Sequence, residues 1–227
     1  MKILVLDVGG IHVKALATGR RKQVQFPSGP RMTPERMVSQ AKIATAGWKY
    51  DAVSIGYPGP VAHGRIAVNP RYLGLGWVGF NFKKAFGCPV KVANDAAMQA
   101  LGSYRGGRML FLGLGTGLGS ALIEDRALVP LELGHLPYQK GESYEDYLGQ
   151  AGLHRFGKLK WLRLVRDVVG RLKNAMQADY VVLGGGNARL IKELPPGTRL
   201  GDNSNAFRGG YRLWAKRYRW DSGWVKQ

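Results

Sequence analysis

The sequence predicts an α/β protein of two similar lobes with a cleft between them. Three observations favour this fold class. Strand-like apolar runs alternate with helix-like segments in both halves, residues 109–123 repeat the pattern of residues 3–17 at a constant offset of 106, and 227 residues suffice for two lobes of roughly 100 residues each. The repeat places Gly9 on Gly115, so each half begins with a strand, a glycine turn and a second strand. This self-similarity indicates an internal duplication.

Four strands and two helices are predicted in the first half. The strand-like apolar runs are residues 2–7, 13–17, 52–56 and 90–93. A helix begins at Thr33-Pro34-Glu35, which supplies an N-cap, a proline suited to the first turn and an acidic residue near the helix N-terminus. Asn94-Asp95 directly follows the last of these strands and begins a second helix.

The second half repeats the strand–turn–strand unit and continues with further helices. The expected elements are a polar loop near 124–142, helices near 143–150 and 158–177, a strand at 179–183, a helix opened by Gly184-Gly185-Gly186, and an amphipathic segment at about 205–218. No Ser-, Pro- or Gly-rich linker divides the halves, so we expect a hinge shared by a first lobe, residues 1–105, and a second lobe, residues 106–204. A C-terminal helix at 205–220 is expected to pack back on the first lobe.

Composition excludes several classes of protein. Hydrophobic residues make up 45% and charged residues 22% of the chain, which rules out a disordered chain, and no apolar run approaches the roughly 20 residues of a membrane span. Residues 1–7 lack the pattern of a signal peptide, so the expected compartment is the cytoplasm. The single cysteine, Cys88, excludes an intrachain disulfide and a cysteine-rich zinc cluster.

The charge balance is strongly basic. The chain has 34 Lys and Arg residues against 15 Asp and Glu residues, and the net charge of +19 indicates a polyanion as substrate or partner: nucleic acid, anionic lipid or polyphosphate. Two segments concentrate this charge, residues 155–173 and the aromatic-rich tail 208–226. Basic and aromatic side chains together can bind single-stranded nucleic acid. The alternative interpretation is a solvated helical face whose aromatic side chains pack inward.

Both glycine turns are candidate phosphate sites. A backbone that approaches a phosphate closely needs residues without Cβ, and a cleft between two such turns could hold a phosphate chain from both sides. Lys14 lies on the strand that leaves the first turn, where its ammonium could reach a phosphate. Glycines also serve plain hairpins, and Lys14 could be an ordinary surface lysine, so the interpretation depends on the duplication.

Two sets of polar residues are candidates for catalysis and substrate binding. An N-cap needs only one of Asn94 and Asp95, so Asp95 could act as a general base toward a substrate hydroxyl. Glu132 and His135 lie around a glycine at a spacing that suits hydrogen bonds to neighbouring sugar hydroxyls. Only His154 lies near them and no cysteine does, which argues against zinc.

Six motifs, taken in order, resemble the ROK sugar kinases, whose fold is the duplicated two-lobe fold of the actin-like ATPases (ribonuclease H-like). The resemblance is nearest to the polyphosphate glucokinase subgroup and covers about residues 2–214. The motifs are Asp7-Val8-Gly9-Gly10 with Lys14, Gly56-Tyr57-Pro58-Gly59-Pro60-Val61, Asn94-Asp95-Ala96, Gly113-Leu114-Gly115-Thr116-Gly117-Leu118-Gly119, Glu132-Leu133-Gly134-His135 and Gly184-Gly185-Gly186-Asn187. Together they are more specific than any one of them.

The resemblance implies a role for each matching residue. Asp95 would take the proton from the primary hydroxyl of the sugar. The residues implied to bind the hexose are Pro58, Gly59, Asn94, Asp95, Glu132 and His135, with Glu145 as the candidate for a second sugar-binding glutamate. Asp7 would orient Mg²⁺ through water. The residues implied to hold the phosphates of ATP or polyphosphate are Asp7, Gly9, Gly10, Lys14, Gly115, Thr116 and Gly117, with Gly184, Gly185 and Gly186 on the adenosine side.

Two positions depart from the family pattern. Ile11 stands where the family usually has a Ser or Thr after the glycine pair, so a hydroxyl that would help to bind phosphate is missing. Tyr72-Leu73 stands where the family often has Asn-Leu, which could alter the choice of sugar.

The expected function is a Mg²⁺-dependent kinase that phosphorylates the 6-hydroxyl of glucose or a related hexose, with polyphosphate or ATP as donor. The resemblance also implies a homodimer, and no membrane partner is expected. Two alternatives remain: a kinase fold weakened at Ile11 that binds a polyanion such as nucleic acid, and a kinase for an amino sugar or another modified hexose.

Overall fold

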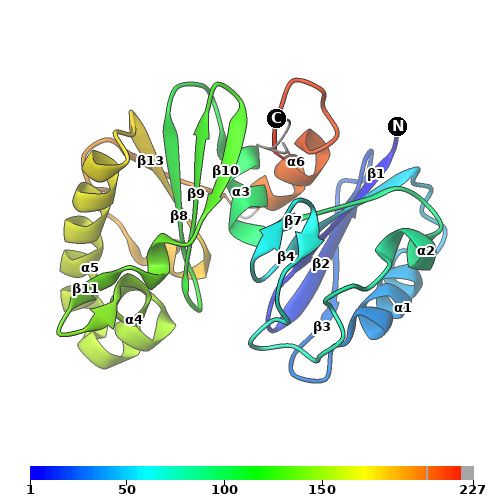
Figure 1. Cartoon of the computed structure of the whole chain (residues 1–227), viewed down its shortest axis with the longest axis horizontal. Coiled ribbons are helices and arrows are strands. Elements are labelled where there is room, and N and C mark those ends of the chain that lie inside the picture. The colour runs from blue at the N-terminus through cyan, green and yellow to red at the C-terminus, as the bar shows by residue number, and fades with distance from the viewer. Residues whose placement is uncertain (203, 221–227) are drawn as a thin grey trace, which may run out of the picture.

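Two five-stranded sheets form the frame of the molecule in the computed structural model, which describes residues 1–202 and 204–220 (Figure 1). The first sheet has the order β3-β2-β1-β4-β7 and the second the order β10-β9-β8-β13-β14. The strands of the first sheet are β1 (Ile3–Val8), β2 (His12–Ala17), β3 (Val24–Pro27), β4 (Ala52–Tyr57) and β7 (Val90–Asn94). Those of the second are β8 (Met109–Leu114), β9 (Leu118–Glu124), β10 (Ala127–Leu131), β13 (Tyr180–Gly184) and β14 (Thr198–Leu200).

The two sheets share one topology. In each sheet the first strand pairs antiparallel with the strand that follows it and parallel with a later strand on its other side: β1 with β2 and β4, and β8 with β9 and β13. The predicted α/β fold with a repeated strand–turn–strand unit is therefore confirmed.

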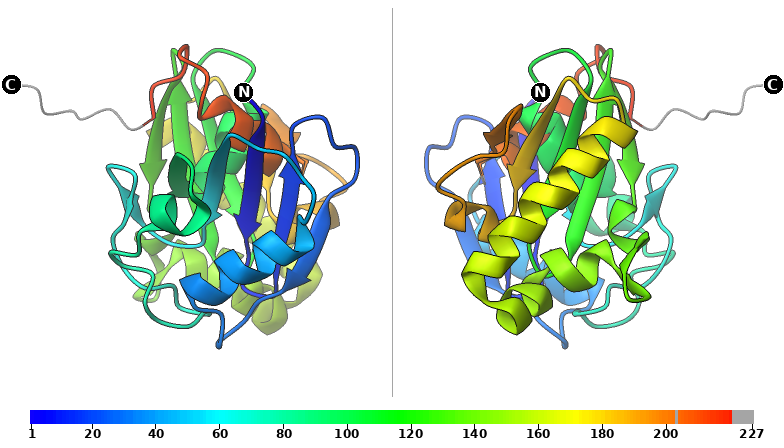
Figure 2. Two further views of the ribbon diagram at one scale, coloured as in Figure 1. Left: turned by 90° about the vertical axis from the view of Figure 1, so that its right-hand side faces the viewer. Right: turned by 90° about the vertical axis from the view of Figure 1, so that its left-hand side faces the viewer.

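Helices cover the outer faces of both sheets. In Figure 2, α1 (Pro34–Ala44) crosses the outer face of the first sheet and α5 (Gln150–Ala175) that of the second. The predicted start of α1 is confirmed, because the Thr33 hydroxyl accepts a hydrogen bond from the amide of Arg36 and a proline occupies the first turn. The remaining short elements are β5 (Val61–Ala62), β6 (Arg65–Ile66), α2 (Phe82–Phe86), η1 (Leu133–His135), β11 (Pro137–Gln139), β12 (Glu142–Ser143), α4 (Tyr144–Leu148) and η2 (Gly186–Leu190).

A layer of two helices lies between the sheets: α3 (Asp95–Ser103) and α6 (Asn205–Arg212) (Figure 1). They pack so closely that a Cβ at Gly102 would collide with the backbone of Asn205, and one at Gly209 with the backbone of Met98. α6 also contacts β1 and β4, where the Ser54 hydroxyl donates a 2.7 Å hydrogen bond to the carbonyl of Gly210. Through this layer the start of α3 is held between the two sheets.

Several sequence-based expectations about elements were wrong. The segment 124–142 is not simply a loop, since it contains β10, η1 and β11; Pro130 is tolerated within β10 because that strand is at the sheet edge. The triglycine run begins only the short 3-10 helix η2, and the last amphipathic segment leaves helical structure after Arg212. Gly157, with φ of 70°, interrupts the helical geometry of α5.

Within residues 1–202 and 204–220, none of the helices has the length and apolar character that crossing a bilayer requires.

Candidate active site

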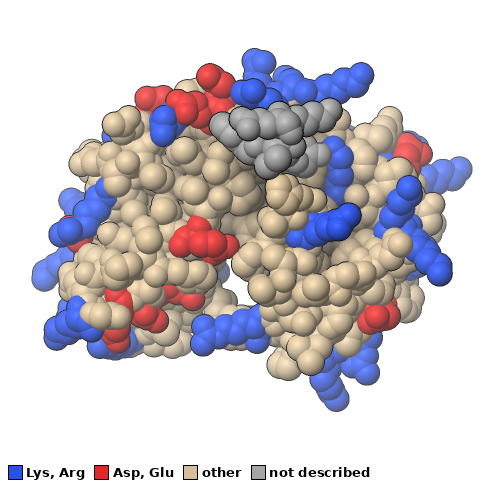
Figure 3. Space-filling model, viewed as in Figure 1, with Lys and Arg blue, Asp and Glu red and all other residues tan. Residues whose placement is uncertain are grey.

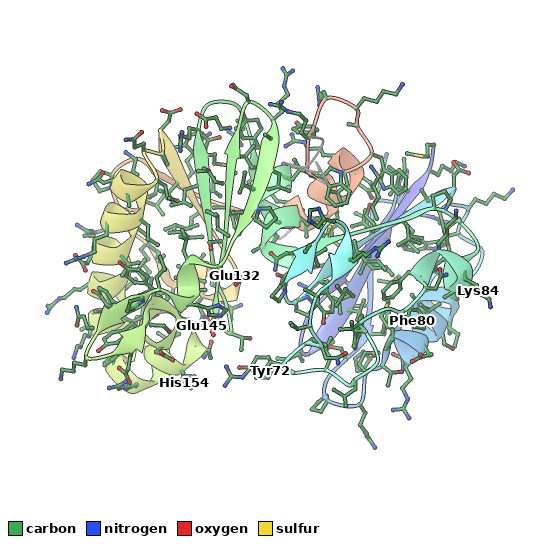
Figure 4. All side chains as sticks on the ribbon, viewed as in Figure 1. Tyr72, Phe80, Lys84, Glu132, Glu145 and His154 are labelled. Carbon is green, nitrogen blue, oxygen red and sulfur yellow. The ribbon has the colours of Figure 1, made fainter. Side chains whose placement is uncertain are left out.

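An opening separates the two lobes on the face shown in Figure 3. Figure 4 shows Glu132 and Glu145 on the wall formed by the second lobe and Tyr72 at the lower end of the opening. The ends of β1 and β7 and the start of α3 belong to the opposite wall, where the sequence predicts the catalytic carboxylates. The predicted site residues therefore come from both lobes.

Asp95 is the first residue of α3, directly after β7. Its Oδ1 accepts a 2.7 Å hydrogen bond from the amide of Ala96, which fixes the orientation of the carboxylate. Burial is the main cause that raises the pKa of Asp95 to about 7; the negative charges of Asp7 and Glu132 add to this rise, and hydrogen bonds from the backbone oppose it. A base whose pKa is close to neutral can both accept and release a proton under ordinary conditions.

Asn94 is the N-cap of α3, so the capping function falls to this residue and leaves Asp95 free of it. The Oδ1 atom of Asn94 accepts a 3.0 Å hydrogen bond from the amide of Ala97, and its Nδ2 donates a 3.1 Å bond to the carbonyl of Gly59. The second bond ties the predicted sugar wall at Pro58-Gly59 to the start of the helix that carries Asp95.

Asp7 lies near the end of β1, opposite Lys14 on β2 and beside Gly56 on β4. Burial raises the pKa of Asp7 to about 6, although the ammonium of Lys14 opposes the shift. Asp7 and Asp95 influence each other electrostatically, which places two carboxylates of the first lobe in one region.

The first glycine turn, residues 9–12, is held by a residue from the end of β3. The Ser28 hydroxyl donates a 2.5 Å hydrogen bond to the carbonyl of Gly9, and the Ser28 amide donates a 2.8 Å bond to the carbonyl of Ile11. Ile11 itself is 77% exposed. Its side chain is therefore mostly in solvent and offers no hydroxyl to a phosphate.

The second glycine turn, residues 115–117, is held from three directions. Asn187 of η2 donates a 3.2 Å hydrogen bond from Nδ2 to the carbonyl of Gly115, and the amide of Gln150 donates a 3.1 Å bond to the carbonyl of Thr116. A Cβ at Gly185, whose φ is 80°, would collide with the backbone of Leu114, so the triglycine run packs directly against the end of β8.

Glu145 lies beside this second turn. Its Oε2 accepts a 3.1 Å hydrogen bond from the amide of Leu118, and a Cβ at Gly117 would collide with its carboxylate. The carboxylate thus belongs to the boundary between the predicted sugar region and the predicted donor turn. This position keeps Glu145 as a candidate for sugar binding.

Glu132 and His135 belong to the segment at η1, which packs against the start of β9: a Cβ at Gly134 would lie 2.6 Å from the carbonyl oxygen of Leu118. The His135 Nδ1 is 3.9 Å from the Glu132 Oε2. Burial raises the pKa of Glu132, His135 opposes the shift and the charge of Glu145 adds to it. Electrostatic coupling thus links Glu132 to Glu145 on its own lobe and to Asp95 across the opening.

Sequence reasoning assigned no role to two residues that shape the site. Ser28 holds the first turn and Asn187 the second. Asn187 is the last residue of the Gly184-Gly185-Gly186-Asn187 motif, so its importance could have been inferred from the motif. Ser28 directly follows β3, a strand that was not predicted from the sequence, and only the folded sheet brings Ser28 close to Gly9.

The basic segment on α5 has a mixed character. Trp161, Val165, Val168 and Leu172 are buried against the second sheet, while the opposite face is basic and exposed. Several of these cations are paired: Arg155 with Glu142 at 2.7 Å, Arg171 with Asp167 at 2.9 Å and Arg166 with Glu193 at 3.9 Å.

The aromatic residues of the C-terminal tail pack inward. Tyr211, Trp214, Tyr218 and Trp220 lie against the buried cluster around α3 and α6. Trp224 and Lys226 lie outside the described residues. In the described part of the tail, the interpretation with inward-packed aromatic side chains is therefore the correct one.

Comparison with known proteins reveals close relatives. No family model matches the sequence. The polyphosphate glucokinase of Mycobacterium tuberculosis (strain CDC 1551 / Oshkosh) is 31% identical over 215 residues, covering 84% of this chain and 80% of the relative. The polyphosphate glucokinase of Mycobacterium leprae (strain TN) is 29% identical over 208 residues, covering 81% of this chain and 63% of the relative.

Solved structures share the fold. The inorganic polyphosphate/ATP-glucomannokinase from Arthrobacter sp. strain KM has a TM-score of 0.78 at 23% identity, over 92% of this chain and 96% of that chain. A ROK family glucokinase from Streptomyces griseus, solved in complex with glucose and AMPPNP, has a TM-score of 0.74 at 19% identity, over 94% and 99% of the two chains.

Proposed function

This chain belongs to the ROK-family sugar kinases, close to the polyphosphate glucokinases, and we propose that it transfers a phosphoryl group from polyphosphate or ATP to the 6-hydroxyl of glucose or a related hexose. The observation that carries the proposal at the level of the site is Asp95. It is a carboxylate at a helix start, oriented by the Ala96 amide, with a pKa of about 7.

Asp95 is the proposed general base. It accepts the proton of the sugar hydroxyl while that oxygen forms a bond to the phosphorus of the donor, and the bond from phosphorus to the leaving phosphate oxygen breaks. Transfer of this kind depends mainly on positioning and on neutralising charge, and less on covalent chemistry by the protein. The fixed orientation of the Asp95 carboxylate supports this role.

The sugar is proposed to lie between Asp95 and the carboxylates of Glu132 and Glu145, with His135 beside Glu132. These groups are coupled electrostatically across the opening, and carboxylates accept hydrogen bonds from the hydroxyls of a sugar ring. Asn94 supports the site by linking Pro58-Gly59 to α3.

The donor phosphates are proposed to lie between the two glycine turns, with Lys14 on the first-lobe side. Each turn is held by a side chain from another part of its own lobe, Ser28 for the first and Asn187 for the second. Preorganised backbone N–H groups can stabilise the developing charge without rearranging during the reaction.

The residues present suit Mg²⁺ better than a metal bound by protein ligands alone. Among residues 1–202 and 204–220, no three His, Cys, Asp or Glu side chains cluster as a metal site. Mg²⁺ usually keeps several waters and binds one or two carboxylates together with substrate phosphates, and Asp7 is the carboxylate proposed to hold it here. When bound, Mg²⁺ would neutralise charge on the donor phosphates.

Polyphosphate is proposed to run along the basic face of α5. A groove of about 520 Å³ lies there; its lining includes apolar side chains, Glu193 and the cations Lys158, Arg163, Arg166 and Lys192. Salt screens such surface charges, so the KM for polyphosphate should rise steeply with ionic strength while the KM for the sugar changes little. Equal insensitivity of both constants would remove the basic face from the proposal.

The experiment that tests the function measures hexose 6-phosphate from glucose and Mg²⁺, with ATP and polyphosphate in parallel and Asp95→Asn as the blank. Asp95→Asn should abolish transfer and keep sugar binding, because the amide cannot accept the proton. Transfer by the wild type that persists in Asp95→Asn would remove Asp95 from the base role.

Failure of the wild type with both donors and with a panel of hexoses and amino sugars would favour the second candidate function. In that reading Ile11 marks lost donor chemistry and the basic face binds a polyanion such as nucleic acid. The homodimer implied by the resemblance stays a prediction. The molar mass of the protein, measured by light scattering during size-exclusion chromatography, tests it.

A further inference from the structure

A loop of the first lobe, residues 67–81, is anchored firmly at its base. The Tyr57 hydroxyl donates a 2.8 Å hydrogen bond to the carbonyl of Val68, and the Asn69 side chain accepts a 3.0 Å bond from the amide of Trp77. Trp77 is fully buried and donates a 3.2 Å bond from Nε1 to the carbonyl of Met32. The loop is therefore a fixed platform and not a free flap.

The platform presents Arg71 and Tyr72 at the rim of the opening. Both residues are exposed, and the Arg71 guanidinium lies 5.6 Å from the centre of the Tyr72 ring. A Cβ at Gly10 would lie 3.6 Å from the Cβ of Tyr72, so the pair sits beside the first glycine turn. Lys and Arg atoms border the lower end of the opening in Figure 3, where Figure 4 labels Tyr72.

Asp146 is an exposed acid on the facing lobe. It follows Glu145 in α4, and Figure 4 shows Glu145 across the opening from Tyr72. The Ser143 amide donates a 2.8 Å hydrogen bond to the Asp146 Oδ2 and the Asp146 amide donates a 3.3 Å bond to the Ser143 hydroxyl, which together form a capping box. The Ser143 hydroxyl also donates a 2.7 Å bond to the same Oδ2. Both hydrogen bonds that the Asp146 carboxylate accepts from the described residues end on Oδ2, so its Oδ1 has no hydrogen-bond partner within residues 1–202 and 204–220.

Arg71 and Asp146 interact electrostatically without touching. No ion pair within 4.0 Å joins them among the described residues. The hydrogen bonds from Ser143 lower the pKa of Asp146 most, and the charges of Arg155 and Arg71 lower it further. Arg155 is already paired with Glu142 at 2.7 Å, which leaves Arg71, on the other lobe, as the second cation whose charge acts on Asp146.

We propose that Arg71 and Asp146 form an interlobe ion pair when the lobes close on the hexose, and that this pair holds α4, with Glu145, over the bound sugar. The inference rests on the proposed function. Arg71 is a positioning residue here, because it acts through Asp146 and α4 and does not touch the sugar. A guanidinium can meet a carboxylate with two parallel hydrogen bonds, which fixes the orientation of the lobes as well as their distance.

The expected effect is modest, because an exposed ion pair is screened by water and salt. Loss of the pair should weaken sugar binding about two- to fivefold. The difference in glucose affinity between wild type and variants should shrink as ionic strength rises, because salt screens the ion pair of the wild type and the variants have no such pair.

The test measures the Kd of glucose by calorimetry without any donor, so that turnover is not required. The variants are Arg71→Ala, Arg71→Lys, Asp146→Asn and the double variant Arg71→Ala/Asp146→Asn. Asp146→Asn retains an oxygen that can accept the capping hydrogen bonds, and thermal unfolding of each variant checks that the fold is kept. Arg21→Ala is the matched control, because it removes an exposed cation on the turn after β2, away from the opening.

The proposal expects Arg71→Ala and Asp146→Asn to weaken glucose binding equally, the double variant to be no weaker than either, and Arg71→Lys and Arg21→Ala to stay close to wild type. Additive effects in the double variant, or an Arg71→Ala protein that binds glucose as the wild type does, would overturn the ion pair and leave the kinase intact. Weaker glucose binding in Arg71→Ala that Asp146→Asn does not reproduce would also overturn it, because Arg71 would then act without Asp146. A wild type that binds no hexose would overturn the proposed function, and the inference with it.

Discussion

The hairpins β1–β2 and β8–β9 share one sequence pattern but close with turns of different length. Val8 pairs with Val13, so the first turn consists of residues 9–12, whereas Leu114 pairs with Leu118 and leaves only residues 115–117. The offset of 106 therefore aligns the first strands of the two units but not the strand pairing after the turns.

This difference in register decides which side chains face each other near the site. In the first hairpin Asp7 lies opposite Lys14. At the matching place in the second hairpin Gly113 lies opposite Gly119. A Cβ at Gly119 would lie 2.6 Å from the Cβ of Ala96, so the glycine there leaves room for the start of α3.

The two hairpins share a backbone pattern but contribute differently to the site. The first hairpin supplies charged groups. The second leaves space for the helix that carries Asp95, and its Leu118 amide donates a hydrogen bond to the Glu145 carboxylate. The first strands β1 and β8 have the same burial pattern, whereas β2 and β9 differ in burial and present different residues near the opening.

Of the two hairpins, the first, with its charged groups, should show the larger effect on catalysis. Asp7→Asn should lower kcat by on the order of 10²–10³, because a preorganised charge at the donor site is lost. Steady-state kinetics with glucose and each donor measure this effect. Asp125→Asn, on the exposed turn after β9, is the control and should keep full activity. An Asp7→Asn protein with turnover within about twofold of wild type would contradict the role of the first hairpin.

The second hairpin should respond through stability. Gly119→Ala forces a methyl group against Ala96 and should destabilise the fold by about 1–3 kcal/mol, the usual range for overpacking. Denaturant unfolding measures the change. Gly115→Ala is the matched control, since its methyl group would meet nothing within 4 Å. Equal effects of the two substitutions would show that the space beside α3 is not the reason for the glycine.

A substitution at Ile11 should improve the binding of the phosphate donor at the first turn. Ile11→Thr restores a hydroxyl and should lower the donor KM or raise turnover about two- to tenfold, the range expected for one hydrogen bond. Stability should not change, because the side chain is 77% exposed. Ile11→Val has nearly the shape of Thr without its hydroxyl, and an equal response of the two variants would exclude the hydroxyl as the cause.

The stability of the fold should also depend on pH. The folded pKa of Asp95, about 7, lies above its ordinary value of 3.8, so the folded state holds the proton more tightly. The resulting stabilisation is complete below about pH 4 and is lost as the pH rises through 7. The asparagine of Asp95→Asn does not ionise, so this variant does not lose stability as the pH rises. In chelator-treated protein it should therefore be more stable than wild type at pH 8, with a smaller difference at pH 5. Denaturant unfolding at both pH values measures the difference, and a constant difference would contradict the raised pKa.

Local sequence signals were sufficient wherever a feature depends on neighbours in the chain. The strands of both units, the Thr33 cap of α1 and the start of α3 at Asn94-Asp95 were predicted correctly, because apolar runs and capping involve residues within a few positions of each other. The candidate site residues could also be named from ordered motifs, and their roles stay predictions that the experiments above test.

Tertiary structure decided the features that join distant segments. Ser28 and Asn187 reach the glycine turns from other strands and helices, and β10 forms in a segment expected to be a loop because a neighbouring strand is there to pair with it. The register of each hairpin and the electrostatic coupling of Asp7, Asp95 and Glu132 likewise depend on packing between parts of the chain far apart in sequence. The sequence by itself determined the chemical groups and the elements that local signals specify, and only the packed fold determined β10 and the distances between the groups, because strand pairing, burial and charge coupling arise from neighbours in space.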